Sequence, residues 1–172
     1  KLPSFEELEN PENNLATEVI SIDGETLGKF YRENRTPVKF SELPDNLIQA
    51  LVSTEDERFY EHSGIDFKGT ARAAIKLGRD GGASTITQQL AKMLFTKQAS
   101  SNIMKRLIQK VKEWVISVRL EQQYTKNEIL TMYLNKYDFG HNAVGIRSAA
   151  RIHFGKEPLD LSIEESAMLV GM

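Results

Sequence analysis

The stretch that most constrains the fold is residues 102–123, a long and unbroken helical pattern. Its larger apolar side chains recur at the spacing of about 100° per residue that places them on one helix face: Ile103, Leu107, Val111, Trp114, Val115 and Val118. The opposite face carries a polar stripe: Arg106, Lys110, Glu113 and Ser117. The pattern predicts a central helical strut whose polar stripe is a solvated surface with a weak Lys110 to Glu113 pair.

Other segments are helical as well. From Pro44 onward, apolar residues recur at helical spacing. Three later segments open with a serine or threonine followed three residues on by glutamate or glutamine, a pairing that satisfies free amides at a helix start. These pairs are Thr85 with Gln88, Thr125 with Glu128, and Ser162 with Glu165. The only clear β signal is a pair of β-prone stretches, residues 17–22 and 26–31, around Asp23-Gly24. The sequence therefore predicts a mainly α domain with a small N-terminal β-hairpin.

Composition narrows the class of protein. The chain has 172 residues, of which 40% are hydrophobic and 27% charged, as is typical of one folded domain with a sizeable core. The net charge of −2 argues against broad nucleic-acid binding, and no nucleic-acid partner is expected. Because there is no cysteine, a disulfide framework, a thiolate zinc site and a cysteine nucleophile are excluded. No stretch reaches the roughly 18 uncharged apolar residues that a membrane-spanning helix needs.

The two ends of the sequence indicate a piece of a longer protein. The chain begins at Lys1 rather than methionine and stops at Met172 within an apolar helical pattern. We expect residues 1–39 to form a lead-in and β-hairpin, and residues 40–172 to form the main domain, truncated at its C-terminal end. An upstream anchor and a downstream domain both fit this interpretation.

Glu55 is the first candidate for chemistry. If the helix that starts at Pro44 continues beyond residue 55, Leu51 and Phe59 flank Glu55 on one arc of the helix. Burial beside apolar side chains disfavours the charged form of a carboxyl group, which suits a general base. If the helix instead ends near Ser53, Glu55 is an ordinary solvated residue.

A second candidate is the segment 82–92. Small residues at its start let a ligand approach the backbone, and a helix start offers free amides. Its polar face carries Thr85, Gln88, Gln89 and Lys92. This face is either a surface for sugar and phosphate groups or an N-cap followed by solvated side chains. It is not a P-loop, because the Gly-Lys-Ser/Thr ending is absent.

Five blocks of the sequence, taken in order, resemble the peptidoglycan glycosyltransferase family. This is family 51 of the glycosyltransferases, found in class A penicillin-binding proteins and in monofunctional enzymes. The blocks are residues 55–64, residues 82–92, residues 110–113, residues 126–135 ending in Tyr-Leu-Asn, and residues 145–156. The resemblance covers residues 40–172 and implies a lysozyme-like, mainly α glycosyltransferase fold.

The resemblance also implies an activity. Such an enzyme polymerises lipid II into β-1,4-linked glycan strands in cell-wall biogenesis, with inversion and release of undecaprenyl pyrophosphate. Glu55 would be the general base on the 4-hydroxyl of the acceptor sugar. Glu113 would be the second catalytic carboxylate, positioning the donor or holding a divalent metal. The implied substrate-binding residues are Asp56, Ser84, Thr85, Gln88, Gln89, Lys92, Lys105, Arg106 and Lys110.

Cofactors and partners follow from the same resemblance. The sequence requires no cofactor, although Mg²⁺ or Mn²⁺ at Glu113 fits the family. The implied partners are lipid II, the growing glycan chain on undecaprenyl pyrophosphate, moenomycin-type inhibitors and a covalently linked transpeptidase domain. The implied location is the extracytoplasmic face of the cytoplasmic membrane, held by an upstream helix. We expect additional contact with the membrane surface through Leu94, Phe95, Ile103 and Met104, unless these side chains simply complete two core helices.

The sequence departs from the family pattern in two places. Gln109 stands before Lys110 where the family commonly has arginine, and Lys105 with Arg106 beside it matches an upstream arginine. Which of Lys105 and Arg106 meets the pyrophosphate is therefore open. Ala83 replaces a frequent glycine.

Two other functions remain as alternatives. A lysozyme-like peptidoglycan hydrolase or lytic transglycosylase would use Glu55 as an acid on a glycosidic bond. The cations at Lys92, Lys105 and Arg106 argue against it, since a neutral sugar leaving group does not need them. A non-catalytic glycan-binding module is the second alternative, and the presence of both Glu55 and Glu113 argues against it.

Overall fold

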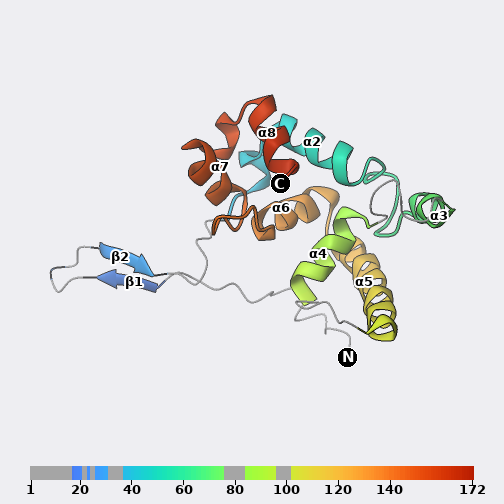
Figure 1. Cartoon of the computed structure of the whole chain (residues 1–172). Helices are drawn as coiled ribbons and strands as arrows, with labels where there is room; N and C mark the ends of the chain where they lie inside the picture. The colour runs from blue at the N-terminus through green and yellow to red at the C-terminus, as the bar shows by residue number, and fades with distance from the viewer. Residues whose placement is uncertain (1–16, 21–22, 24–25, 31–36, 76–83, 96–101) are drawn as a thin grey trace.

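The computed structural model of the chain describes residues 17–20, 23, 26–30, 37–75, 84–95 and 102–172 (Figure 1). Helices dominate these residues, as the sequence predicts. The elements are β1 (Thr17–Ile20), β2 (Thr26–Phe30), the short 3-10 helix η1 (Phe40–Glu42), α2 (Asp45–Glu55), α3 (Phe67–Ile75), α4 (Ile86–Phe95), α5 (Ile103–Gln123), α6 (Lys126–Lys136), α7 (Ile146–Phe154), η2 (Pro158–Asp160) and α8 (Ile163–Val170).

The N-terminal strands β1 and β2 pair antiparallel, with Thr17 opposite Phe30 and an irregularity between Val19 and Ile20. Their bounds fall inside the two predicted β stretches. Residues 21–22 and 24–25 of the expected turn, like the lead-in at residues 1–14, lie outside the described residues.

Local chemistry explains where the helices begin. Thr125 and Ser162 each accept a hydrogen bond from the amide three residues on, and the glutamate at that position bonds back, as predicted. At α4 only half of this arrangement forms. Thr85 Oγ1 accepts from the Gln88 amide at 3.1 Å, while the Gln88 side chain donates to the carbonyl of Gly64 at 3.2 Å. The start of α4 is thus fastened to the turn that follows α2.

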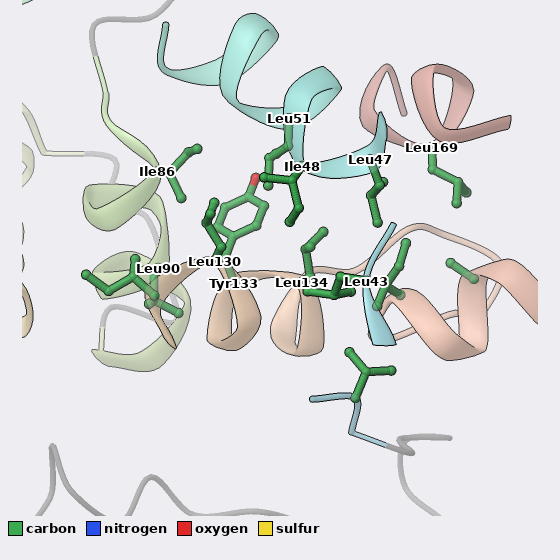
Figure 2. Close-up of a cluster of buried hydrophobic side chains, with 14 of the residues drawn as sticks. Leu43, Leu47, Ile48, Leu51, Ile86, Leu90, Leu130, Tyr133, Leu134 and Leu169 are labelled. Atoms are coloured by element: carbon green, nitrogen blue, oxygen red, sulfur yellow. The ribbon is translucent and has the colours of Figure 1, made fainter. Parts of the chain in front are cut away.

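The core is centred on α6. Buried side chains of α6 pack against apolar side chains of α2, α4 and α8, as Figure 2 shows for Leu130, Leu134, Leu47, Leu90 and Leu169. Asn135 at the end of α6 bonds both backbone groups of Val38, at 2.8 and 2.9 Å. This contact between residues far apart in the sequence holds the segment before η1 against α6.

The orientation of α5 differs from the prediction. Its bounds agree with the expected helix, but part of its apolar face is exposed, with Leu107 at 61% and Val111 at 50%. The polar stripe turns inward in its second half, since Glu113 is 5% exposed and Ser117 is fully buried. The predicted solvated stripe is therefore wrong at these two residues, while Arg106 is exposed as expected.

Polar partners on neighbouring segments explain this inward turn. The Glu121 carboxylate accepts a hydrogen bond from Thr87 of α4 at 2.6 Å and pairs with Lys126 at 2.8 Å. Gly64, with φ of +90°, packs so closely on α5 that a Cβ there would lie 2.8 Å from the Ser117 carbonyl. Buried polar groups are stable when they are hydrogen-bonded, so α4 and this turn can cover the polar side of α5.

None of the described helices is long and apolar enough to cross a membrane.

Candidate active site

Glu55 is the last residue of α2, and the helix stops there because the chain changes direction at Asp56. Of the two alternatives that the sequence leaves open, a helix that continues beyond residue 55 is therefore wrong, and one that ends near Ser53 is closer to the structure. Phe59 is nonetheless fully buried, because the turn after α2 brings it back into the core. Glu55 is half-buried rather than solvated, which matches neither alternative fully.

Asp56 fixes the position of Glu55 relative to α4. Its carboxylate accepts a hydrogen bond from the Ile86 amide at 3.0 Å and lies 2.9 Å from Nε2 of His62. Asp56 is 7% exposed, so both contacts are largely shielded from solvent. The structure thus places this expected substrate-binding residue inside the protein, where it joins the end of α2 to the start of α4.

Gln89 and Tyr133 lie next to Glu55. Gln89 Nε2 donates a hydrogen bond to Glu55 Oε2 at 2.7 Å, and the Tyr133 hydroxyl donates to Gln89 Oε1 at 3.1 Å. Burial, together with the negative charge of Glu55, raises the pKa of the Tyr133 hydroxyl well above its usual value. Three helices therefore meet at one hydrogen-bonded chain, α2 through Glu55, α4 through Gln89 and α6 through Tyr133.

Two other expected binding residues of α4 point into the protein. Thr85 and Gln88 are 2% and 1% exposed, and both donate side-chain hydrogen bonds to the Gly64 carbonyl. Ser84 and Gln89 are half-buried and Lys92 is exposed. Within this block, Ser84, Gln89 and Lys92 are the residues that a ligand could reach.

A second polar group lies on the inner face of α5. Lys110 Nζ donates to Ser84 Oγ at 2.7 Å and lies 3.4 Å from a carboxylate oxygen of Glu113. Glu113 is buried, and Lys110 is about one-third exposed. The Lys110 to Glu113 pair predicted from the sequence exists, but it faces the neighbouring segment 84–95 instead of solvent.

The remaining expected cations lie near the junction of α4 and α5. Lys92, Lys105 and Arg106 are all exposed. Lys92 is in the last turn of α4, Lys105 and Arg106 are in the first turn of α5, and the two helices lie side by side (Figure 1). Because Arg106 is four residues before Lys110, it shares the side of α5 that carries Lys110 and Glu113.

The two polar groups converge on the start of α4. Asp56, next to Glu55, binds the amide of Ile86, and Ser84, two residues before Ile86, binds Lys110. The arrangement offers a half-buried carboxylate on one side and cations on the other. It can accept a proton on the first side and neutralise an anionic leaving group on the second.

Glu113 is the residue at which a divalent metal was expected. The described residues contain no group of three or more histidine, cysteine or acidic side chains placed to share an ion. Glu113 pairs with the ammonium of Lys110 at 3.4 Å. One carboxylate beside an ammonium is not a complete donor set for Mg²⁺ or Mn²⁺, so no step below is assigned to a metal.

Sequence reasoning missed two residues of this site. Tyr133 was part of the Tyr-Leu-Asn block but had no role assigned, because its apolar neighbours on α6 indicate a core position. His62 was expected to be a structural histidine with its polar atoms satisfied, and its ring nitrogen Nε2 lies 2.9 Å from the carboxylate of Asp56, a partner that the sequence did not indicate. A spacing of six residues across a helix end gives no signal for such a contact.

The family of the chain follows from comparison with known proteins. The transglycosylase family model matches residues 23–172, and the chain belongs to this family.

The relatives of the chain agree with this assignment. The chain is similar to penicillin-binding protein 1A of Pseudomonas aeruginosa, with 39% identity over 99% of the chain, and to penicillin-binding protein 1A of Vibrio cholerae, with 40% identity over 99%. It is also similar to penicillin-binding protein 1F of Bacillus subtilis, with 39% identity over 92%. The chain spans 21–22% of the length of these relatives. The resemblance to the peptidoglycan glycosyltransferases of class A penicillin-binding proteins is thereby confirmed.

Proposed function

We propose that this domain polymerises lipid II into β-1,4-linked glycan strands at the extracytoplasmic face of the cytoplasmic membrane. The observation that carries the proposal is the setting of Glu55. Its carboxylate is half-buried, and one of its oxygens accepts a hydrogen bond from Gln89 of α4, the helix that also carries the exposed cation Lys92. A base and an anion-binding surface are the two parts that this reaction needs.

The reaction is a single displacement. Glu55 accepts the proton of the 4-hydroxyl on the acceptor GlcNAc, and that oxygen attacks C1 of the donor MurNAc. The bond from C1 to the pyrophosphate oxygen breaks, and undecaprenyl pyrophosphate leaves from the opposite face, so the configuration at C1 inverts. The cations at the α4 and α5 junction neutralise the charge that grows on the leaving group.

Glu113 has a different task in this scheme. It is buried beside Lys110, whose ammonium also binds Ser84. A buried carboxylate in this position holds the lysine in place for the donor, and Ser84 adds a hydroxyl to the same surface. Asp56, Thr85 and Gln88 contribute by fixing the start of α4.

The exposed face of α5 supports contact with a membrane surface. Met104, Leu107, Ile108 and Val111 are exposed on it, and a hollow of about 430 Å³ lined by Ile65, Val111, Trp114, Val115, Val118, Arg119 and Gln122 continues the same surface. Exposed Lys105 and Lys112 flank this strip and complement anionic lipid head groups. Leu94 and Phe95, expected in the same contact, instead pack against the core.

An assay on the purified domain with labelled lipid II tests the activity. It should resolve polymer, cleaved fragments and unchanged substrate. Polymer is the expected product. Fragments released from preformed glycan would indicate a hydrolase or lytic transglycosylase, and unchanged substrate would indicate a binding module.

Flotation with vesicles that contain anionic lipid tests the membrane contact. Wild type should float, and Val111→Glu, which places a charge in the exposed strip, should float less. Asn127→Glu, at an exposed position of α6, is the matched control and should behave as wild type. Equal flotation of both variants would rule out the α5 face as the contact.

A further part of the proposal concerns the longer protein. The likeness to the class A penicillin-binding proteins supports an upstream membrane anchor, a linked transpeptidase domain and inhibition by moenomycin-type compounds. A lysozyme-like arrangement of the helices belongs to the same proposal.

A further inference from the structure

The hydrogen-bonded chain that joins three helices at Glu55 contains a residue with no contact to a possible substrate. Tyr133 is 3% exposed and its ring belongs to the core. Figure 2 shows it rising from α6 with its hydroxyl directed toward α2 and Leu51. Within these apolar surroundings the hydroxyl has a polar partner, since it donates a hydrogen bond to Oε1 of Gln89 at 3.1 Å.

The direction of this hydrogen bond determines what Gln89 presents to Glu55. A glutamine amide has an oxygen that accepts and a nitrogen that donates. With Oε1 engaged by the Tyr133 hydroxyl, Nε2 faces the Glu55 carboxylate and donates to Oε2 at 2.7 Å. An amide turned by 180° would place oxygen against carboxylate oxygen, which is repulsive. The ionised carboxylate requires the observed orientation of the amide, and the Tyr133 hydroxyl holds the amide in that orientation by donating to Oε1.

Tyr133 remains a donor under working conditions. Its pKa is raised by burial and by the neighbouring carboxylate, so the hydroxyl stays protonated when Glu55 is charged. Donation to Gln89 also satisfies a polar group that would otherwise be buried without a partner, and this keeps the contact in place.

As a consequence, the two carboxylate oxygens of Glu55 differ in their hydrogen bonding. Oε2 is occupied by Gln89, and within the described residues no hydrogen bond engages Oε1. A base works well only when its free oxygen is held in the right geometry before the reaction.

We propose that Tyr133 is a positioning residue which acts through Gln89 on Glu55 and leaves Oε1 of Glu55 as the atom that takes the acceptor's proton. The inference rests on the proposed glycosyltransferase function and adds a residue to it. Tyr133 makes no contact with substrate in this scheme, so its substitution should change the turnover rate and leave substrate affinity alone.

The test compares Tyr133→Phe, Gln89→Leu and the double variant in the lipid II polymerisation assay, on the chain as described. Tyr133→Phe keeps the ring in the core and removes only the hydroxyl. We expect kcat to fall roughly 10- to 100-fold with KM little changed. Because Tyr133 acts through Gln89, adding Tyr133→Phe to Gln89→Leu should produce no further fall in kcat.

Tyr137→Phe is the matched control. The Tyr137 ring stacks on that of Tyr133, with centroids 5.3 Å apart, and the same single oxygen is removed. This variant should turn over as wild type does. Helicity and melting temperature are measured for every variant.

Several outcomes would overturn the inference. One is an unchanged kcat for Tyr133→Phe, and another is a fall of equal factor in the wild-type and Gln89→Leu backgrounds, which would indicate a merely structural role. If Tyr133→Phe does not fold, Gln89→Leu alone decides: a wild-type kcat, or a loss confined to KM, contradicts the inference. A wild-type protein that forms no polymer would overturn the proposed function and this inference together, whereas an active wild type isolates the failure to Tyr133.

Discussion

Glu55 and Glu113 are the two carboxylates of the site, and their surroundings differ in kind. Glu55 is half-buried at the end of α2, and its contact is a neutral amide, Gln89. Glu113 is 5% exposed in the middle of α5, and its contact is a cation, Lys110. A carboxylate held by an amide keeps an oxygen available for a proton, whereas one buried against an ammonium serves to hold that charge. In the proposed reaction, this difference supports proton transfer at Glu55 and charge organisation at Glu113.

The largest effect should come from Glu55→Gln. The amide keeps the size, and its oxygen can still accept the hydrogen bond from Gln89, but it cannot accept the hydroxyl proton. Polymerisation should fall by roughly 10²- to 10⁴-fold. The measurement is polymer yield from labelled lipid II, with Glu57→Gln, at an exposed neighbouring position, as the control. A near wild-type rate for Glu55→Gln would remove the distinction between the two carboxylates.

Glu113→Gln should have a smaller effect, on the order of 10²-fold or less, because it disturbs the placement of Lys110 without removing a reacting atom. The loss should fall on use of the donor. Kinetics at varied lipid II concentration, at equal helicity, measure it. Because Glu113 is buried, loss of helicity in this variant would indicate a structural role for Glu113. A residue on a solvated helix face would have no such role.

The cations at the junction of α4 and α5 should be next. Lys92→Ala and Arg106→Ala should each reduce transfer about 10-fold or more, because they remove charge that stabilises the departing pyrophosphate. Lys105→Ala should have less effect than Arg106→Ala, since adjacent helical residues point about 100° apart and Arg106 shares the side of Glu113. Transfer rates at equal protein concentration decide this. Equal and small losses of transfer rate for all three variants would contradict the proposal that these cations stabilise the departing pyrophosphate.

The last prediction concerns the stability of the domain, and it tests the pair on α5. Lys110→Met leaves the Glu113 carboxylate buried beside an apolar side chain, which should lower the free energy of unfolding by about 1–3 kcal/mol. The double variant Lys110→Met with Glu113→Gln should recover part of this loss, because no buried charge is left unpaired. Chemical denaturation of the three variants measures both. If the single and double variants are equally stable, burial of Glu113 has no energetic consequence.

Much of the α-helical architecture is predictable from local patterns. The N-caps at Thr125 and Ser162 and the bounds of α5 depend on residues within a few positions of each other, and the structure confirms them. The block of residues 82–92 and Glu55 were likewise expected as candidate site residues. Helix α3 was not expected from the sequence, although Asp66 caps its start by accepting a hydrogen bond from the Gly69 amide at 3.0 Å.

Contacts between distant segments account for what the sequence could not predict. The inward turn of Glu113 depends on Ser84 and Lys110, which are 26 residues apart, and the tie from Asp56 to Ile86 spans 30. A hydropathy pattern predicts that an apolar helix face is buried and that a polar face is solvated. It cannot predict that a polar face is buried against polar side chains of another segment. The unexpected burial of Glu113 and Ser117 has this same cause. So does the contact of Tyr133 with Gln89, which the sequence did not predict.

The orientation of α5 has a consequence for how the domain tolerates substitution. In most helices a mutational scan finds the apolar positions sensitive and the polar positions permissive. On α5 the two classes should mix: in detergent, exposed positions such as Leu107 and Ile108 should accept polar replacements, while Ser117, packed under Gly64, should accept as few as the buried apolar residues Ile116 and Leu120. A ranking of variants by hydropathy alone would therefore misjudge several positions of this helix.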